Sequence, residues 1–134
     1  MFRKIRQKDI GDIKTPEEVY NYAESIGKPV PELEDVIAQD PKWSFYYAVN
    51  IIKGRFEKGE NAIAQSSEQS FWYARTVIEG RFREGEDVIA QDPYWSYRYA
   101  VEVIEGRFEE GEKSIAQSPF WSERYAKELN LEEF

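Results

Sequence analysis

Neither cysteine nor histidine occurs among the 134 residues. Their absence excludes a disulfide framework, thiol and imidazole catalysis, and the usual zinc and copper ligand sets. No apolar run approaches the ~18 residues that a membrane-spanning helix needs, and the first 14 residues lack the apolar stretch of a secretory signal. These absences predict a cytoplasmic protein of a reducing compartment, with no cofactor and no metal. A content of 41% hydrophobic and 16% aromatic residues is sufficient to fill a core.

An internal repeat organises the rest of the sequence. The tripeptide Gly-Arg-Phe occurs at 54–56, 80–82 and 106–108, a period of 26 residues. Units 40–65 and 92–117 are identical at 17 of 26 positions. Together the units cover residues 15–39, 40–65, 66–91, 92–117 and, as a partial unit, 118–134. The repeat predicts a single helical-repeat domain over 15–134, preceded by a basic leader at 1–14.

Each unit is predicted to form two helices. The first helix begins at a residue with a short oxygen-bearing side chain, followed by proline in four of the five units: Thr15, Asp40, Ser66, Asp92 and Ser118. It is expected to end at a left-handed glycine, namely Gly54, Gly80 or Gly106. Serine in the middle of its apolar face (Ser44, Ser70, Ser96, Ser122) indicates close helix contact, with the hydroxyl bonded to the carbonyl four residues earlier.

The second helix is predicted to be short, about Glu57 to Ala64 and its equivalents. It contains a glycine (Gly59, Gly85 or Gly111) that costs ~1 kcal/mol relative to alanine, so we expect this glycine to contact a neighbouring helix or ring closely. No single unit can bury its apolar face alone. The predicted fold class is therefore all-α, a short α-solenoid of stacked helical hairpins with a 26-residue period. A closed helical bundle is the alternative.

The consensus Tyr-Ala-x-x-(Val/Ile)-Ile-x-Gly-Arg-Phe-x-x-Gly-Glu-x-x-Ile-Ala-Gln resembles a tandem repeat of uncharacterised tailed-phage and phage-metagenome proteins. The resemblance covers Thr15 to Phe134 and leaves out the basic leader. It implies a virus-encoded protein that acts in the cytoplasm of a bacterial host, and it implies no activity.

An arginine and a glutamate recur five residues apart in the three complete repeats: Arg55 with Glu60, Arg81 with Glu86, and Arg107 with Glu112. We interpret them as structural ion pairs across the turn between the two helices, with the guanidinium stacked on an aromatic ring. A ladder of ligand-binding charges is the alternative. The first unit has Glu34 but carries Pro29 where the arginine should be, so its pairing is uncertain from the sequence.

Catalysis is not expected. The acidic residues lie mainly at helix starts and on predicted solvent faces, as charges that serve solubility do. The sequence also lacks a glycine-rich phosphate loop and a metal-ligand cluster. An enzyme would require a deep cleft around a Glu–Arg pair, with a strongly perturbed glutamate.

Variable aromatic and arginine side chains occupy two sets of equivalent positions on the outer face of the first helices. The candidate partner-binding residues are Tyr46, Trp72, Tyr94, Arg98, Phe120 and Arg124. Partly exposed Tyr, Trp and Arg side chains are typical of interface hot spots. The alternative is that neighbouring repeats cover them.

Charge is uneven along the sequence. Residues 1–14 contain five basic and two acidic side chains, whereas the remaining 120 contain 13 and 24. An acidic body disfavours direct nucleic-acid binding and suits a protein partner with a basic surface. The sequence thus predicts a non-enzymatic protein-binding module, and the resemblance implies that it is a phage-encoded modulator or inhibitor of a bacterial host protein such as a defence factor. The alternatives are a self-associating structural repeat protein, whose open ends stack, and an acidic mimic of nucleic acid.

Overall fold

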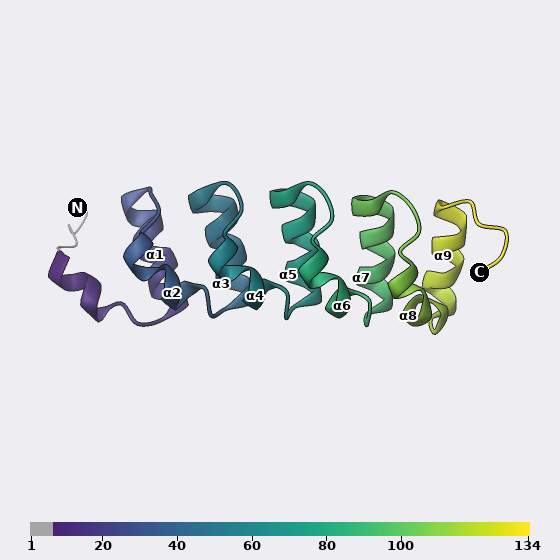
Figure 1. Ribbon diagram of the computed structural model, residues 1–134, viewed down its shortest axis with the longest axis horizontal. Coiled ribbons are helices and arrows are strands. Elements are labelled where there is room, and N and C mark those ends of the chain that lie inside the picture. Colours follow the sequence, from purple (N-terminus) through teal and green to yellow (C-terminus); the bar gives the residue numbers. More distant parts are fainter. Residues whose placement is uncertain (1–6) are drawn as a thin grey trace. The chain divides into compact units, whose positions relative to one another are not determined.

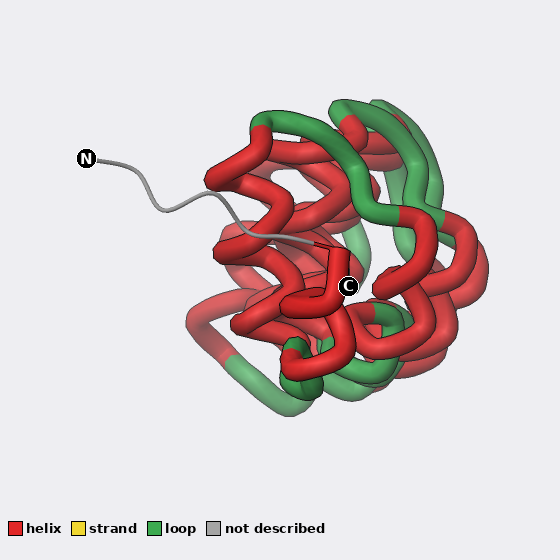
Figure 2. The backbone as a smooth tube through the Cα atoms, turned by 90° about the vertical axis from the view of Figure 1, so that its left-hand side faces the viewer, coloured by secondary structure: helices red, strands yellow, loops and turns green. Residues whose placement is uncertain are grey.

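The computed structural model describes residues 7–134, and these residues form helices joined by loops, with no strand among them (Figures 1 and 2). They divide into two compact units, with the division after Ala62, and each is described by itself. No helix in this part of the chain is both long and apolar enough to cross a bilayer. The first six residues of the basic leader lie outside the described residues.

The first unit contains two helical hairpins. Its elements are η1 (Gln7–Asp12), α1 (Pro16–Ile26), η2 (Pro31–Leu33), α2 (Glu34–Ile37), α3 (Pro41–Tyr46), η3 (Tyr47–Ile52) and η4 (Glu57–Gly59), and α4 (Glu60–Ile63) lies at the division. The η label marks 3₁₀ turns and, for η3, a π-helix. Helix α1 packs against both α2 and α3.

The second unit contains two complete hairpins and a final helix. Its elements are α5 (Ser67–Trp72), η5 (Tyr73–Ile78), η6 (Arg83–Gly85), α6 (Glu86–Ile89), α7 (Pro93–Arg98), η7 (Tyr99–Ile104), η8 (Glu109–Gly111), α8 (Glu112–Ala116) and α9 (Pro119–Glu128). Helix α7 lies between α5 and α9 and packs against both (Figure 1). The expected all-α repeat of stacked helical hairpins is confirmed.

The predicted helix starts are confirmed. Asp92 accepts a hydrogen bond from the Trp95 N–H at 2.9 Å, and the corresponding side chains at 40, 66 and 118 cap their helices in the same way. Thr15 and Glu18 form a complete capping box.

The predicted helix ends are wrong by one residue. The left-handed residues are Lys53, Glu79 and Glu105, at φ 60°, 57° and 58°, and not the glycines that follow them. The helix before each of them continues as a π-helix (η3, η5 and η7), a geometry that accommodates one additional residue.

This additional residue explains the two repeat lengths. The left-handed residue lies 13 positions after the N-cap in the hairpins with a π-helix. In the first hairpin the interval from Thr15 to Gly27 is 12, and in the last, from Ser118 to Asn130, it is also 12. The first unit is one residue shorter because α1 has no π-helical insertion.

A glutamate in the left-handed region gives a testable consequence. Such a conformation costs a residue with a Cβ roughly 1 kcal/mol, and glycine avoids that cost. Glu105→Gly is therefore expected to raise the unfolding free energy by about 0.5 to 1 kcal/mol in urea denaturation. The matched control is Glu109→Gly in η8, where the 3₁₀ backbone is right-handed and glycine should lower stability. A loss of stability in both variants would contradict this reason.

The second helix has about the predicted extent, 57–63 and 109–116, but it is not one continuous α-helix. Each consists of a 3₁₀ turn followed by a single short α-helix, as in η6 and α6. The expectation of close contact at its glycine is confirmed. A Cβ built on Gly85 would lie 2.6 Å from the Ser70 Cβ and 2.7 Å from the Phe82 Cδ2, and Gly59 and Gly111 are equally crowded by their serine and phenylalanine.

The mid-face serines join the two helices differently from the prediction. The Ser96 hydroxyl donates to the Ile89 carbonyl at 2.8 Å, seven residues earlier and in the preceding short helix. Ser44, Ser70 and Ser122 make the equivalent bonds to Ile37, Ile63 and Ile115. The small side chain thus permits close packing and satisfies the end of the short helix at the same time.

Candidate functional site

The repeated arginine and glutamate form bidentate ion pairs, as predicted. The Arg81 Nε and Nη2 donate to Glu86 at 2.7 and 2.8 Å. Arg55 with Glu60 and Arg107 with Glu112 have the same geometry. The expected ring stacking is wrong for Arg81 and Arg107, because in the second unit the arginines that stack on rings are Arg98 and Arg124.

A buried tyrosine from the following hairpin completes the ion pair, and the sequence analysis missed it. The Tyr99 hydroxyl donates to Glu86 at 2.6 Å and accepts the Phe82 N–H at 2.9 Å. Tyr125 makes the same two bonds, with Glu112 and the Phe108 N–H. The sequence does contain a signal for this contact, because tyrosine recurs with the repeat at 47, 73, 99 and 125. In the structure each of these side chains is fully buried.

The same arrangement persists in the first hairpin without an arginine. The Tyr47 hydroxyl donates to Glu34 at 2.8 Å and accepts the Val30 N–H at 2.9 Å. The loss of the arginine at Pro29 therefore leaves the tyrosine link intact.

The electrostatics of these groups fit a structural role. Burial alone would raise the pKa of Glu86, but hydrogen bonds from Arg81 and Tyr99 outweigh it and the pKa is lowered. The bond from Arg107 likewise lowers the pKa of Glu112. Burial raises the pKa of Tyr99 above its ordinary value. Each glutamate is held charged, whereas a general acid needs a raised pKa.

Tyr46 is the one candidate partner-binding residue in the first unit. Its side chain is 37% exposed and packs edge-on against Trp43, with ring centroids 5.5 Å apart. Its ring also lies 6.2 Å from that of Tyr20 in α1. Aromatic neighbours therefore cover part of this ring and leave part of it exposed.

Arg98 is the centre of the candidate residues in the second unit. Its guanidinium lies 5.0 Å from the Trp72 ring and 5.7 Å from the Tyr94 ring. It also donates to Glu102 at 2.6 and 3.0 Å and to the Tyr94 hydroxyl at 3.1 Å. Trp72, Tyr94 and Arg98 are half-buried, so neighbouring helices cover them in part.

Phe120 and Arg124 repeat the pairing on α9 and are more open. The Phe120 side chain is 56% exposed, and the Arg124 guanidinium lies 4.7 Å from its ring. Both residues border a depression of about 250 Å³ on α9. We call Trp72, Tyr94, Arg98, Phe120 and Arg124 the aromatic–arginine surface.

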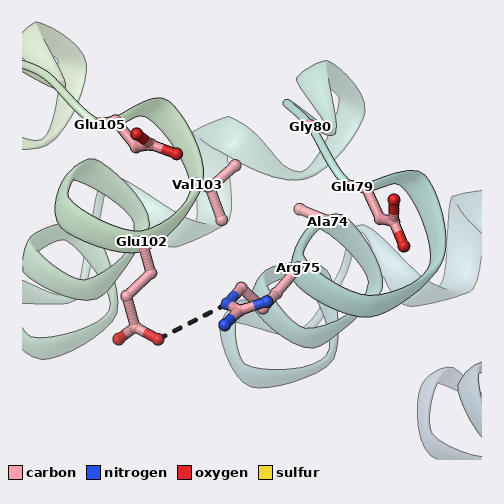
Figure 3. Close-up of a pocket in the computed structure, with 7 residues that line it drawn as sticks. All are labelled: Ala74, Arg75, Glu79, Gly80, Glu102, Val103 and Glu105. Carbon is pink, nitrogen blue, oxygen red and sulfur yellow. Dashed lines mark ion pairs between the residues drawn. The ribbon is translucent and has the colours of Figure 1, made fainter.

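A second depression, of about 260 Å³, lies between η5 and η7 (Figure 3). Three of its lining residues are the glutamates 79, 102 and 105, and the Arg75 Nε lies 3.7 Å from Glu102. Arg75 is half-exposed, and Glu102 is also bound by Arg98. The depression therefore has the charges of a Glu–Arg site, but it is an open hollow and not the deep cleft that an enzyme would require.

Metal chemistry has no evident site in residues 7–134, where no group of three or more carboxylates is placed to hold an ion. In comparisons with known proteins, the chain matches no family model, no curated protein and no solved structure. The geometry of the described residues is therefore the basis for a functional proposal.

Proposed function

We propose that this chain is a non-enzymatic protein-binding module that uses the aromatic–arginine surface of its second unit. Aromatic and arginine side chains contribute most of the binding energy in protein interfaces. The surface combines both, with Phe120 56% exposed and Arg98 held among rings. Tyr46 offers a similar aromatic side chain on the first unit.

The observation that carries the proposal is the immobilisation of Arg98. Its two bonds to Glu102, its bond to Tyr94 and its stacking on Trp72 fix the guanidinium before any partner arrives. A side chain that is already ordered loses little conformational entropy on binding. The aromatic–arginine surface therefore supports a role in binding more strongly than the depression between η5 and η7 supports a role in catalysis.

Charge indicates the chemistry of the partner. Acidic side chains outnumber basic ones by 26 to 18, so the field of the chain attracts a basic protein surface and repels a phosphate backbone. The resemblance to phage repeat proteins supports the proposal of a bacterial partner, a host protein such as a defence factor that the chain would modulate. That setting rests on the resemblance and on the charge alone.

Trp72→Ala is expected to weaken partner binding by about 2 kcal/mol, or roughly 30-fold in Kd, without unfolding the chain. The substitution removes the ring beneath Arg98 and leaves the fully buried Phe71 to fill the core. The wild type and the variant, each immobilised, would be exposed to bacterial lysate. A captured protein would then be purified and titrated against both by calorimetry.

Phe134→Ala provides the matched control. Phe134 is an aromatic residue that is 42% exposed, packs on Tyr125 and does not belong to the aromatic–arginine surface. The proposal requires binding to fall for Trp72→Ala and to persist for Phe134→Ala. Equal losses in the two variants, or a partner indifferent to both, would assign binding to another surface.

A further inference from the structure

Within each unit, the stacking of successive hairpins uses one recurrent aromatic pair. A ring on the first helix packs against the tryptophan at the third position of the next helix. In the first unit Tyr20 of α1 meets Trp43 of α3 at 5.4 Å between centroids. In the second unit Phe71 meets Trp95 at 5.2 Å, and Tyr97 meets Trp121 at 5.1 Å.

On α1 and α9, the first and last α-helices, one member of this pair is replaced by glutamate. On α9 the position equivalent to Phe71 and Tyr97 is Glu123, and on α1 the position equivalent to the tryptophans is Glu18. Both glutamates are exposed. The residues that would join α9 of one molecule to α1 of another are therefore two carboxylates.

We infer that Glu18 and Glu123 prevent a second copy of this chain from stacking on α9 or α1 by the contact that joins its own hairpins. In that register the two carboxylates would face each other across a closed contact, where water is removed and like charges repel. Terminal repeats of stacked folds need a polar outer face for the same reason.

A cation lies near each glutamate, Lys14 beside Glu18 and Lys127 beside Glu123, and because both lysines are exposed they offset this repulsion only in part. Glu18 is engaged in its own capping box, where it accepts the N–H groups of Lys14 and Thr15 at 3.1 and 3.0 Å. Those bonds lower its pKa, so the carboxylate stays charged. Arg124, a second cation beside Glu123, reaches back towards Tyr97 of α7 and stacks on Phe120.

This inference does not rest on the proposed function, and its test needs no partner. The wild type is expected to keep the mass of a monomer by light scattering and sedimentation from about 10 to about 500 µM. The double variant Glu18→Trp, Glu123→Tyr restores the aromatic pair on both outer faces. It is expected to grow beyond a dimer with concentration, because each added copy presents a new free face.

Mixing two single variants gives the sharpest result. Glu123→Tyr has an aromatic α9 face and Glu18→Trp has a matching α1 face, while each keeps a glutamate on its other face. Each is expected to be monomeric alone, and the mixture is expected to form a 1:1 dimer that does not grow. This arm stays informative if the double variant fails to fold.

The control replaces two exposed glutamates elsewhere, Glu57→Trp with Glu109→Tyr, and is expected to remain monomeric. Circular dichroism and melting temperature verify the fold of every variant. Growth of the wild type, a folded mixture that stays monomeric, or growth of the control as strong as that of the double variant would each overturn the inference.

Discussion

Gly85→Ala is expected to lower the unfolding free energy by about 3 kcal/mol, corresponding to a fall of roughly 10 °C in Tm. The new Cβ would overlap the Ser70 side chain and the Phe82 ring. Ser70 cannot move freely, because it is fully buried and its hydroxyl donates to the Ile63 carbonyl. The backbone at Gly85 has φ −95°, which alanine adopts easily, so the loss would come from packing alone.

Gly80→Ala separates this cause from a general effect of alanine. A Cβ at Gly80 would lie 3.9 Å from the Ile78 Cγ2, an ordinary contact, and φ is outside the left-handed region. We expect its stability to stay within about 0.5 kcal/mol of the wild type. The measurement is urea denaturation followed by circular dichroism. Similar losses in the two variants would refute the role of close packing at Gly85.

Glu86→Ala is expected to lower the unfolding free energy by about 2 to 3 kcal/mol at pH 7. It removes the shared acceptor of Arg81 and of the buried Tyr99 hydroxyl. Arg81 remains partly in water, with 30% of its side chain exposed, so the loss falls below that of a fully buried pair. Glu110→Ala is the control, because Glu110 approaches the same arginine only to 4.0 Å and is 56% exposed.

At acidic pH, the difference in unfolding free energy between the wild type and Glu86→Ala is expected to become smaller. The folded-state pKa of Glu86 lies below its ordinary value of 4.5, so its ionised form stabilises the fold above pH 4.5. That contribution is lost as the pH falls through the folded pKa. The gap in stability between the wild type and Glu86→Ala should therefore narrow below pH 4.5. A constant gap, or an equal loss for Glu110→Ala, would remove the ion pair as its cause.

Sequence periodicity predicted the features that depend on local chemistry. The N-caps at Thr15 and Asp92 and the Arg81–Glu86 pair involve residues three to five positions apart, so spacing alone is enough to place them together. The close approach at Gly85 was also predicted, because a glycine retained in a helix despite its cost indicates crowding.

Features that depend on the neighbouring hairpin were missed or misplaced. The Ser96 hydroxyl donates to the carbonyl of Ile89, seven residues earlier, because the preceding short helix α6 ends against it. Helical spacing had suggested a carbonyl four residues earlier. Tyr99 reaches Glu86 across 13 residues, a distance that no local rule predicts. The left-handed residue is Glu105 because the π-helical insertion shifts the helix end.

For the candidate binding surface too, the sequence predicted one property and only the structure showed another. Its residue types at Trp72, Arg98 and Phe120 were evident from the repeat, but their exposure was not. Arg98 proves to be enclosed by rings from α5 and α7, whereas Phe120 is open. Exposure follows from which helix lies alongside, and a helical wheel contains no such information.

By itself, the sequence determined that this protein is all-helical, that it repeats every 26 residues, and where its helices begin, because caps, periodicity and short-range ion pairs act within a few residues of the chain. Only the tertiary structure decided how, within each unit, a hairpin receives the tyrosine of the next and which aromatic side chains stay open. It also decided that Glu18 and Glu123 occupy the positions of the stacking pair on the outer helices. Those outcomes depend on the packing of residues from different hairpins, where van der Waals contact and burial act over distances that sequence spacing does not encode.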